Sequence, residues 1–193
     1  MAQVEIPAVY MRGGSSKGVI FHSRDLPASR EARDRLFLAA LGSPDPFGRQ
    51  LDGMGGGISS LSKAAVIGPP THPDADVDYT FAQVAVDRPV VDYGANCGNL
   101  SSAVGPFAVD EGLVAVSDGD FVDPAGSVAR GQAAGIHASP TADVRVGNPS
   151  GCLPVAAAVT PDGAGGWCVT HSAAYRTARR LMGGRAYARL EEP

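Results

Sequence analysis

The hydrophobic pattern of the first 45 residues predicts a hairpin followed by a helix. Apolar and polar residues alternate over residues 3 to 10, and a second apolar stretch at residues 19 to 21 follows a Gly-Gly-Ser-Ser break. This alternation around a glycine turn is typical of two paired strands. Apolar residues then recur at helical spacing from residue 32 to 41, which predicts a helix with Ser29 as its N-cap and Gly42 as its end.

Further along the chain, short apolar runs alternate with turns. Residues 60 to 68 predict a buried strand with Lys63 at its entrance, and residues 79 to 86 predict another. Residues 101 to 109 predict a helix that Gly105-Pro106 would kink or end. The remaining chain predicts a turn-rich segment at 117–140, strands at 144–147, 153–159 and 167–173, a turn at 161–166, and a closing helix at 177–184. Many short strands around two or three helices indicate an α+β fold.

Composition narrows the possible partners. At 193 residues, 44% hydrophobic and 19% charged, the chain is long enough for one large domain or two small ones. A net charge of −4 without a basic stripe argues against nucleic-acid partners and membrane-surface binding, and favours a small-molecule ligand. No apolar run approaches the ~20 residues of a membrane span, and no signal peptide is evident at the start. We expect a cytoplasmic location.

Several common site motifs are missing from the sequence. Three cysteines without a CxxC pair and four scattered histidines fit neither a disulfide scaffold nor a zinc cluster, so we expect reduced thiols and no metal. The segment GMGGGISS fails the GxGxxG spacing, and MRGGSSKGV fails as a P-loop because Lys17 precedes its second glycine. No GxSxG elbow occurs. Nucleotide binding and serine hydrolase chemistry are therefore weakly supported.

The stretch VDYGANCGNLSSAVGPF places Cys97 where a strand would turn into a helix. Backbone N–H groups at a helix start bind anions and favour the thiolate form of a cysteine. The alternative is an inert buried cysteine, because free cysteine is among the most buried residue types. The surrounding glycines favour the reactive interpretation.

Three glycine-rich loops each hold a nucleophilic or basic side chain. They comprise residues 12–18, 55–63 and 94–99. Backbone donors and hydroxyls in such loops suit a substrate with several carboxylates. Each loop alone could be a turn with a solvated lysine, but three together favour a binding site.

Five segments carry a family resemblance. MRGGSSKGVIF, GGGISSLSKAAVI, VDYGANCGNLSSAVGPFAVDEGLV, RVGNPSGCLPV and RTARRLMGG resemble, in the same order, signature segments of the PrpF family. That family includes methylaconitate and methylitaconate isomerases and 4-oxalomesaconate tautomerase. The resemblance implies a diaminopimelate-epimerase-like fold, in which a small mixed sheet wraps around a central helix. It also implies proton transfer without a cofactor, as a 1,3-shift on unsaturated polycarboxylates.

The resemblance also suggests a site. Lys63 and Cys97 align with the family's catalytic lysine and cysteine, although the sequence leaves open which of them removes the proton. For Lys63 to act as a base, burial and neighbouring cations such as Arg12 or Lys17 would have to lower its pKa. Asn148 replaces the histidine of a family His-Pro-Ser-Gly loop, which lies at a helix N-terminus. From this loop and the glycine-rich loops, the expected substrate-binding residues are Arg12, Ser15, Ser16, Lys17, Ser60, Ser62, Asn96, Gly98, Asn99 and Ser150.

The resemblance covers roughly residues 4 to 130 and 143 to 187, while family members are much longer. We therefore expect a first domain over residues 1–130 that carries the site motifs. Residues 131–193 would form a remnant of a second domain and a return segment, packed as one unit with the first. The expected function is an isomerase or tautomerase that acts as a homodimer. The alternative is a catalytically degenerate binding or accessory protein.

Overall fold

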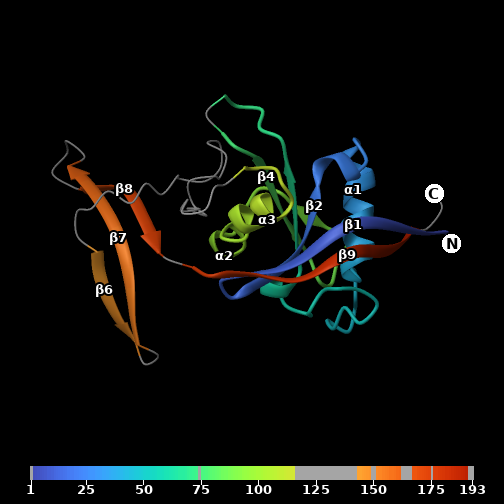
Figure 1. Ribbon diagram of the computed structural model, residues 1–193. Helices are drawn as coiled ribbons and strands as arrows, with labels where there is room; N and C mark the ends of the chain where they lie inside the picture. Colours follow the sequence, from blue (N-terminus) through green and yellow to red (C-terminus); the bar gives the residue numbers. More distant parts are fainter. Residues whose placement is uncertain are drawn as a thin grey trace.

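The computed structural model describes residues 2–73, 75–115, 143–148, 151–161, 167–174 and 176–190. Its main body is a six-stranded sheet with the order β5-β4-β3-β2-β1-β9 (Figure 1). Strands β2 and β3 are parallel and the other neighbours are antiparallel, so the sheet is mixed. The strands are β1 (Ala2–Gly13), β2 (Ser16–His22), β3 (Lys63–Gly68), β4 (Asp78–Val84), β5 (Val91–Asp92) and β9 (Ala178–Leu190).

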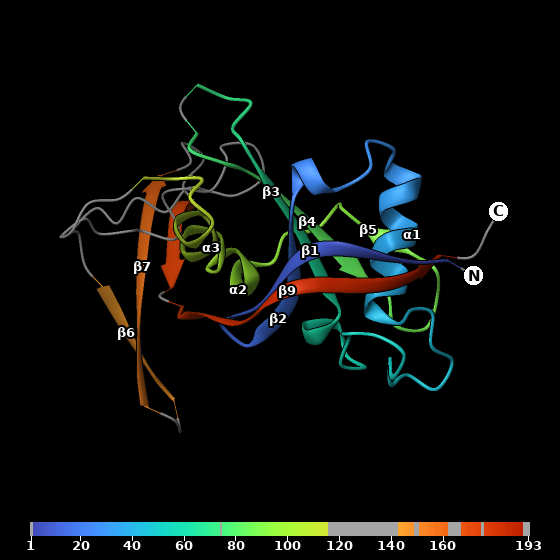
Figure 2. The ribbon, with the colours of Figure 1, turned by 45° about the vertical axis from the view of Figure 1, so that its right-hand side comes forward.

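Helices cover both faces of this sheet. Helix α1 (Arg30–Leu41) lies on one face, and α2 (Gly98–Ser101) and α3 (Val104–Asp110) lie on the other (Figures 1 and 2). Successive strand residues point to opposite faces. Val19 and Phe21 accordingly pack in the core under α1, whereas Ile20 packs in the core under α2 and α3. This three-layer arrangement confirms the α+β prediction. Two short 3₁₀ turns complete the body, η1 (Ser23–Asp25) and η2 (Ser59–Leu61).

The helix termini follow the predicted signals. Ser29 caps α1, with its hydroxyl accepting a hydrogen bond from the Ala32 backbone N–H at 3.2 Å, and Gly42 ends the helix in the left-handed conformation (φ 72°). Gly105-Pro106 lies in the first turn of α3, where backbone N–H groups have no intrahelical partner and proline costs no hydrogen bond. The pair therefore neither kinks nor ends α3, and the helix predicted over 101–109 is instead interrupted before it, between α2 and α3.

The predicted closing helix at 177–184 is wrong. This segment begins β9, which pairs antiparallel with β1 from Gly13↔Ala178 to Ala2↔Leu190 (Figure 2). Gly183 and Gly184 disfavour a helix, and after them Ala186 and Ala188 are buried while the residues between and beside them are exposed, the alternation of a strand. Pairing along the whole length of β1 outweighs a weak local helix propensity.

A second sheet contains three antiparallel strands in the order β6-β7-β8. These are β6 (Asp143–Asn148), β7 (Gly151–Pro161) and β8 (Trp167–Ala174), which confirms the three predicted strands. In Figures 1 and 2 this sheet lies apart from the six-stranded sheet. The turn-rich segment 117–140 and most of the turn at 161–166 lie outside the described residues. The predicted domain boundary at residue 130 also lies there, so the division into 1–130 and 131–193 stays a prediction.

Candidate active site

Two of the three glycine-rich loops meet where the tip of the β1–β2 hairpin touches the start of α2. A Cβ added to Gly13 would lie 2.4 Å from the backbone oxygen of Asn99, and one added to Gly14 would lie 2.3 Å from Asn99 Oδ1. Gly14 also has a φ of +53°, which side chains rarely adopt. The glycine pair is therefore what lets the hairpin approach the turn that carries Cys97.

Cys97 is the N-cap residue of α2, which confirms the predicted strand, turn and helix around it. Its Sγ accepts a hydrogen bond from the Leu100 backbone N–H at 3.4 Å, and its own N–H donates to Asn96 Oδ1 at 2.8 Å. The Ser16 hydroxyl, almost fully buried, lies 3.6 Å from Sγ. Cys97 itself is only half-buried, so its thiol is held by hydrogen-bonding groups and is not sealed in the core.

Lys63 is the first residue of β3 and is only 6% exposed. Its Nζ donates to Gln83 Oε1 at 2.5 Å and lies 5.0 Å from the centre of the Phe81 ring. Burial lowers the pKa of the Lys63 ammonium, and the negative charge of Cys97 opposes this by raising it. The expected causes were burial and neighbouring cations such as Arg12 or Lys17. In the structure, burial is the cause.

The third loop lies beside the other two at Gly18. A Cβ there would lie 3.0 Å from the Lys63 backbone oxygen and 2.8 Å from the Leu100 side chain, so the start of β3 and helix α2 both approach this glycine. An amine with a lowered pKa and a half-buried thiol are both groups that can exchange protons with a ligand.

Polar side chains around Cys97 and the hairpin tip, called the rim below, are linked by hydrogen bonds. Asn99 donates from Nδ2 to the Ser15 hydroxyl at 3.1 Å, and its Oδ1 accepts from Arg176 Nε at 3.0 Å. Arg12 donates to the backbone oxygens of Gly14 and Thr177, at 2.8 and 3.0 Å. These bonds tie the residues just before β9 to the hairpin tip.

The remaining residues that were predicted to bind substrate have the following positions. Lys17 stands opposite Arg12 in the hairpin register. Ser60 lies in η2 and is partly exposed. Asn96 and Gly98 are exposed on either side of Cys97. The structure therefore brings Ser15, Ser16, Asn96, Gly98 and Asn99 together around the thiol.

Ser62 and Ser150 are not brought to this place. The Ser62 hydroxyl is fully buried, where it donates to the Val84 backbone oxygen at 2.9 Å and accepts from Gln50 Nε2 at 2.7 Å. Ser150 lies outside the described residues. Asn148 ends β6 and Gly151 begins β7, so Ser150 is followed by a strand, whereas the family loop that it resembles lies at a helix N-terminus.

Three residues near the site were not predicted from the sequence. Gln83 bonds Lys63, and Arg176 bonds Asn99. Tyr79, like Cys97, packs against the core under α2 and α3, and its buried hydroxyl has no hydrogen-bond partner within the described ranges. Burial, and then the charge of Cys97, raise the pKa of Tyr79. The alternation of β4 places residues 79, 81 and 83 on one face, a signal that could have identified Tyr79 and Gln83.

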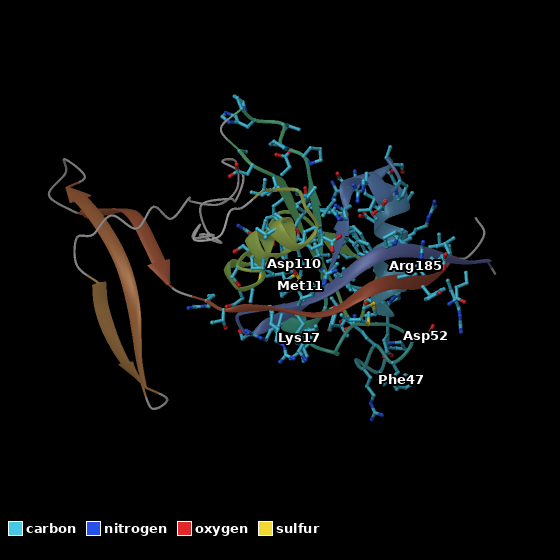
Figure 3. The ribbon with its side chains drawn as sticks, viewed as in Figure 1. Met11, Lys17, Phe47, Asp52, Asp110 and Arg185 are labelled. Atoms are coloured by element: carbon cyan, nitrogen blue, oxygen red, sulfur yellow. The ribbon has the colours of Figure 1, made fainter. Side chains whose placement is uncertain are left out.

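A large cavity lies on a part of the surface that does not include Lys63 or Cys97. It measures about 1100 Å³ and is lined by residues near the start of β1, the end of β9 and the loop after α1. Figure 3 shows Phe47 and Asp52 on that loop and Lys17 on a different part of the sheet. Within the described residues, no helix is long and apolar enough to cross a membrane, and no cluster of metal-ligating side chains occurs.

Known proteins resemble this chain over much of its length. The family model described as PrpF protein matches residues 3–122. The chain belongs to the PrpF family. It is 55% identical over 119 residues to a 2-methyl-aconitate isomerase of Cupriavidus necator, a match that covers 60% of this chain and 30% of that protein. It is 50% identical over 151 residues to a 4-oxalomesaconate tautomerase of Pseudomonas putida, covering 76% of this chain and 40% of that protein.

A solved structure shares the fold. The crystal structure of a methylitaconate-delta-isomerase superimposes with a TM-score of 0.74 at 40% identity, covering 97% of this chain and 97% of that chain. The diaminopimelate-epimerase-like fold implied by the resemblance to PrpF proteins is thereby confirmed. The chain spans about 30 to 40% of the length of the two curated relatives described above.

Proposed function

We propose that this PrpF chain is an isomerase that moves a proton between two carbons of a small unsaturated polycarboxylate. The proposal rests on two groups: Lys63, which is buried at the start of β3 and has a lowered pKa, and Cys97, whose half-buried thiol is hydrogen-bonded at the start of α2. The relatives named above act on 2-methylaconitate, methylitaconate and 4-oxalomesaconate, all of which are unsaturated carboxylates. A substrate of this class fits a rim of hydroxyl, amide and guanidinium donors.

The proposed step is a 1,3-proton shift. One of the two groups, as a neutral amine or a thiolate, removes a proton from the allylic carbon. The C–H electron pair becomes the new double bond while the old double bond moves its electrons toward the carboxylate. The other group, as an ammonium or a thiol, then donates a proton to the carbon that has lost its double bond. Product and substrate are isomers, and the reverse reaction exchanges the two roles.

The step changes no oxidation state, so two proton-transfer groups suffice, and we propose that no cofactor takes part. We also propose a cytoplasmic location, because a working thiol must stay reduced and the cytoplasm keeps thiols reduced. We further propose a homodimer. The residues beside Cys97 are exposed, and a charged intermediate is stabilised best where water is excluded, which a second subunit could achieve.

The test is proton exchange in D₂O. The full chain is incubated with methylitaconate, 2-methylaconitate or 4-oxalomesaconate, and ¹H NMR follows loss of the allylic signal and appearance of the isomer. Succinate, which has no carbon–carbon double bond, is the control ligand. We expect exchange with at least one unsaturated acid, and loss of exchange in Cys97→Ala. Absence of exchange with all three acids would favour the alternative, a degenerate binding or accessory protein.

A binding measurement separates the two functions further. An accessory protein could still bind an unsaturated acid at the same rim, and this binding would be visible by calorimetry without exchange. Light scattering after size exclusion tests the homodimer in the same samples. An exchanging monomer would disprove the dimer while leaving the isomerase intact.

A further inference from the structure

Gln83, near the end of β4, is held on three sides. Its Nε2 donates to the backbone oxygens of Ser59 and Ser62, at 3.0 and 2.8 Å, and its Oε1 accepts from Lys63 Nζ at 2.5 Å. The two carbonyls can only accept hydrogen bonds, so they fix which end of the amide carries the NH₂ group. Oε1 must therefore face Lys63. The amide cannot turn over without breaking all three bonds.

This arrangement gives Lys63 a neutral acceptor. A carbonyl oxygen accepts one N–H from either the ammonium or the neutral amine, so it holds Nζ in place in both states. A carboxylate in the same position would favour the ammonium and raise the pKa of Lys63. Within the described residues, Cys97 is the ionisable group whose charge acts on Lys63, while the Phe81 ring and Gln83 are uncharged. The lowered pKa thus depends on position 83 remaining neutral.

We propose that Gln83 is a positioning residue for Lys63, which orients the amine toward the substrate and holds it in place in both its charged and its neutral state. This inference rests on the proposed function and takes Lys63 as the group that removes the proton. Gln83 acts through Lys63 and need not touch the substrate. Its amide is fixed by the η2 turn, so the turn that begins β3 also sets the direction of the base.

The experiment compares three variants of the full chain. Gln83→Glu keeps the shape and adds a negative charge beside Nζ. Gln83→Met keeps the approximate length and removes the acceptor. Gln3→Glu adds the same charge at an exposed position far along β1 and serves as the matched control.

The chain offers a direct readout that does not require activity. It contains two lysines, Lys17 and Lys63, so lysine labelled with ¹³C at Cε gives two NMR signals to titrate. We expect the same Lys63 midpoint in the wild type and in Gln3→Glu. In Gln83→Glu, the Lys63 midpoint should move to higher pH. An unmoved Lys63 midpoint in folded Gln83→Glu would overturn the proposal.

Kinetics supplies the second readout. The exchange rate of Gln83→Glu at neutral pH should fall by about tenfold or more and recover as the pH rises, because a general base works only when unprotonated. Gln83→Met should lower kcat by about tenfold with little change in KM, since the substrate loses no contact. Wild-type kcat in Gln83→Met would overturn the positioning role, even if Gln83→Glu fails to fold. If the wild type shows no exchange, the proposed function fails, and the lysine titration still decides whether Gln83 controls Lys63.

Discussion

Ser62 and Lys63 are neighbours in one glycine-rich loop, both were expected to serve the site, and the fold uses them in opposite ways. Ser62 is fully buried among groups that satisfy its hydroxyl completely. Lys63 points to the other face, where its amine has one neutral acceptor and a nearby thiol. A strand sends consecutive side chains to opposite faces, so one step along the chain separates a structural group from a chemical one.

The glutamines that bond these two residues, Gln50 and Gln83, differ in the same way. Gln50 donates to the hydroxyls of Ser43 and Ser62 and accepts from the Gly57 backbone N–H, so both ends of its amide serve the loop. Gln83 uses one end for the backbone and the other for Lys63. A glutamine whose hydrogen bonds all go to groups of the loop, as in Gln50, stabilises the fold. A glutamine with one hydrogen bond to a titratable group, as in Gln83, also affects the protonation of that group. The two networks should therefore respond differently to substitution.

The largest expected effect belongs to Lys63→Met. Methionine matches the length and apolar stem of lysine but cannot accept or donate the proton. We expect the exchange rate to fall by about 10² to 10⁴, the range that a general base typically contributes. The free energy of unfolding should not fall, because the variant no longer buries an ammonium. Deuterium exchange by NMR and urea unfolding measure the two effects, and a folded variant with wild-type exchange would remove Lys63 from the mechanism.

Ser62→Ala should produce the opposite pattern. It removes an acceptor from Gln50 Nε2 and a donor from the Val84 carbonyl inside the core. Unpaired buried polar groups cost about 1 to 3 kcal/mol, so urea unfolding should report a loss of that size. Exchange per folded molecule should stay within a few-fold of the wild type. A stable variant that loses exchange would instead place Ser62 with the substrate contacts.

Much of the fold could be predicted from local patterns. The hairpin, α1 with its caps, and the strands β3 and β4 follow from periodicity and from residues such as Ser29 and Gly42. The helix expected at 177–184 failed because β9 is specified by its pairing with β1, more than 160 residues away in the sequence. The alternation of Ala186 and Ala188 that marks this strand starts only after the glycines.

Part of the site could likewise be predicted from the sequence, and part could not. The meeting of Cys97 with the hairpin tip could be expected from its glycines, because only glycine permits the close approach seen at Gly13 and Gly14. The loss of Ser62 from the site could not be predicted, because its side chain leaves an irregular turn between η2 and β3, where the order of residue types does not show which way a side chain points. Gln83 could have been found, because it lies within β4 on the same face as Tyr79.

The pH dependence of stability provides a smaller test of the same contrast. The pKa of Lys63 is lower in the folded than in the unfolded chain, so the unfolded chain binds more protons between the lowered value and 10.5. The free energy of unfolding therefore gains a contribution from Lys63 as pH rises through this window, and loses it as pH falls. Lys63→Met should lack this contribution. Its stability advantage over the wild type should shrink toward pH 10.5, whereas Ser62→Ala should parallel the wild type across the window, as measured by urea unfolding from pH 7 to 10.5.

The smallest expected effect is that of Tyr79→Phe, which tests a polar group that neither network uses. The Tyr79 hydroxyl is buried and has no hydrogen-bond partner within the described ranges, while the ring packs against the core under α2 and α3. Phenylalanine keeps the ring and removes the unpaired hydroxyl, so stability should be unchanged or rise by up to about 1 kcal/mol. This contrasts with Ser62→Ala, where a hydroxyl with two partners is lost. Urea unfolding of both variants in one buffer makes the comparison. A loss above about 1 kcal/mol in Tyr79→Phe would mean that the hydroxyl has a bound partner in solution, and repeating the measurement with methylitaconate present would show whether the ligand is that partner.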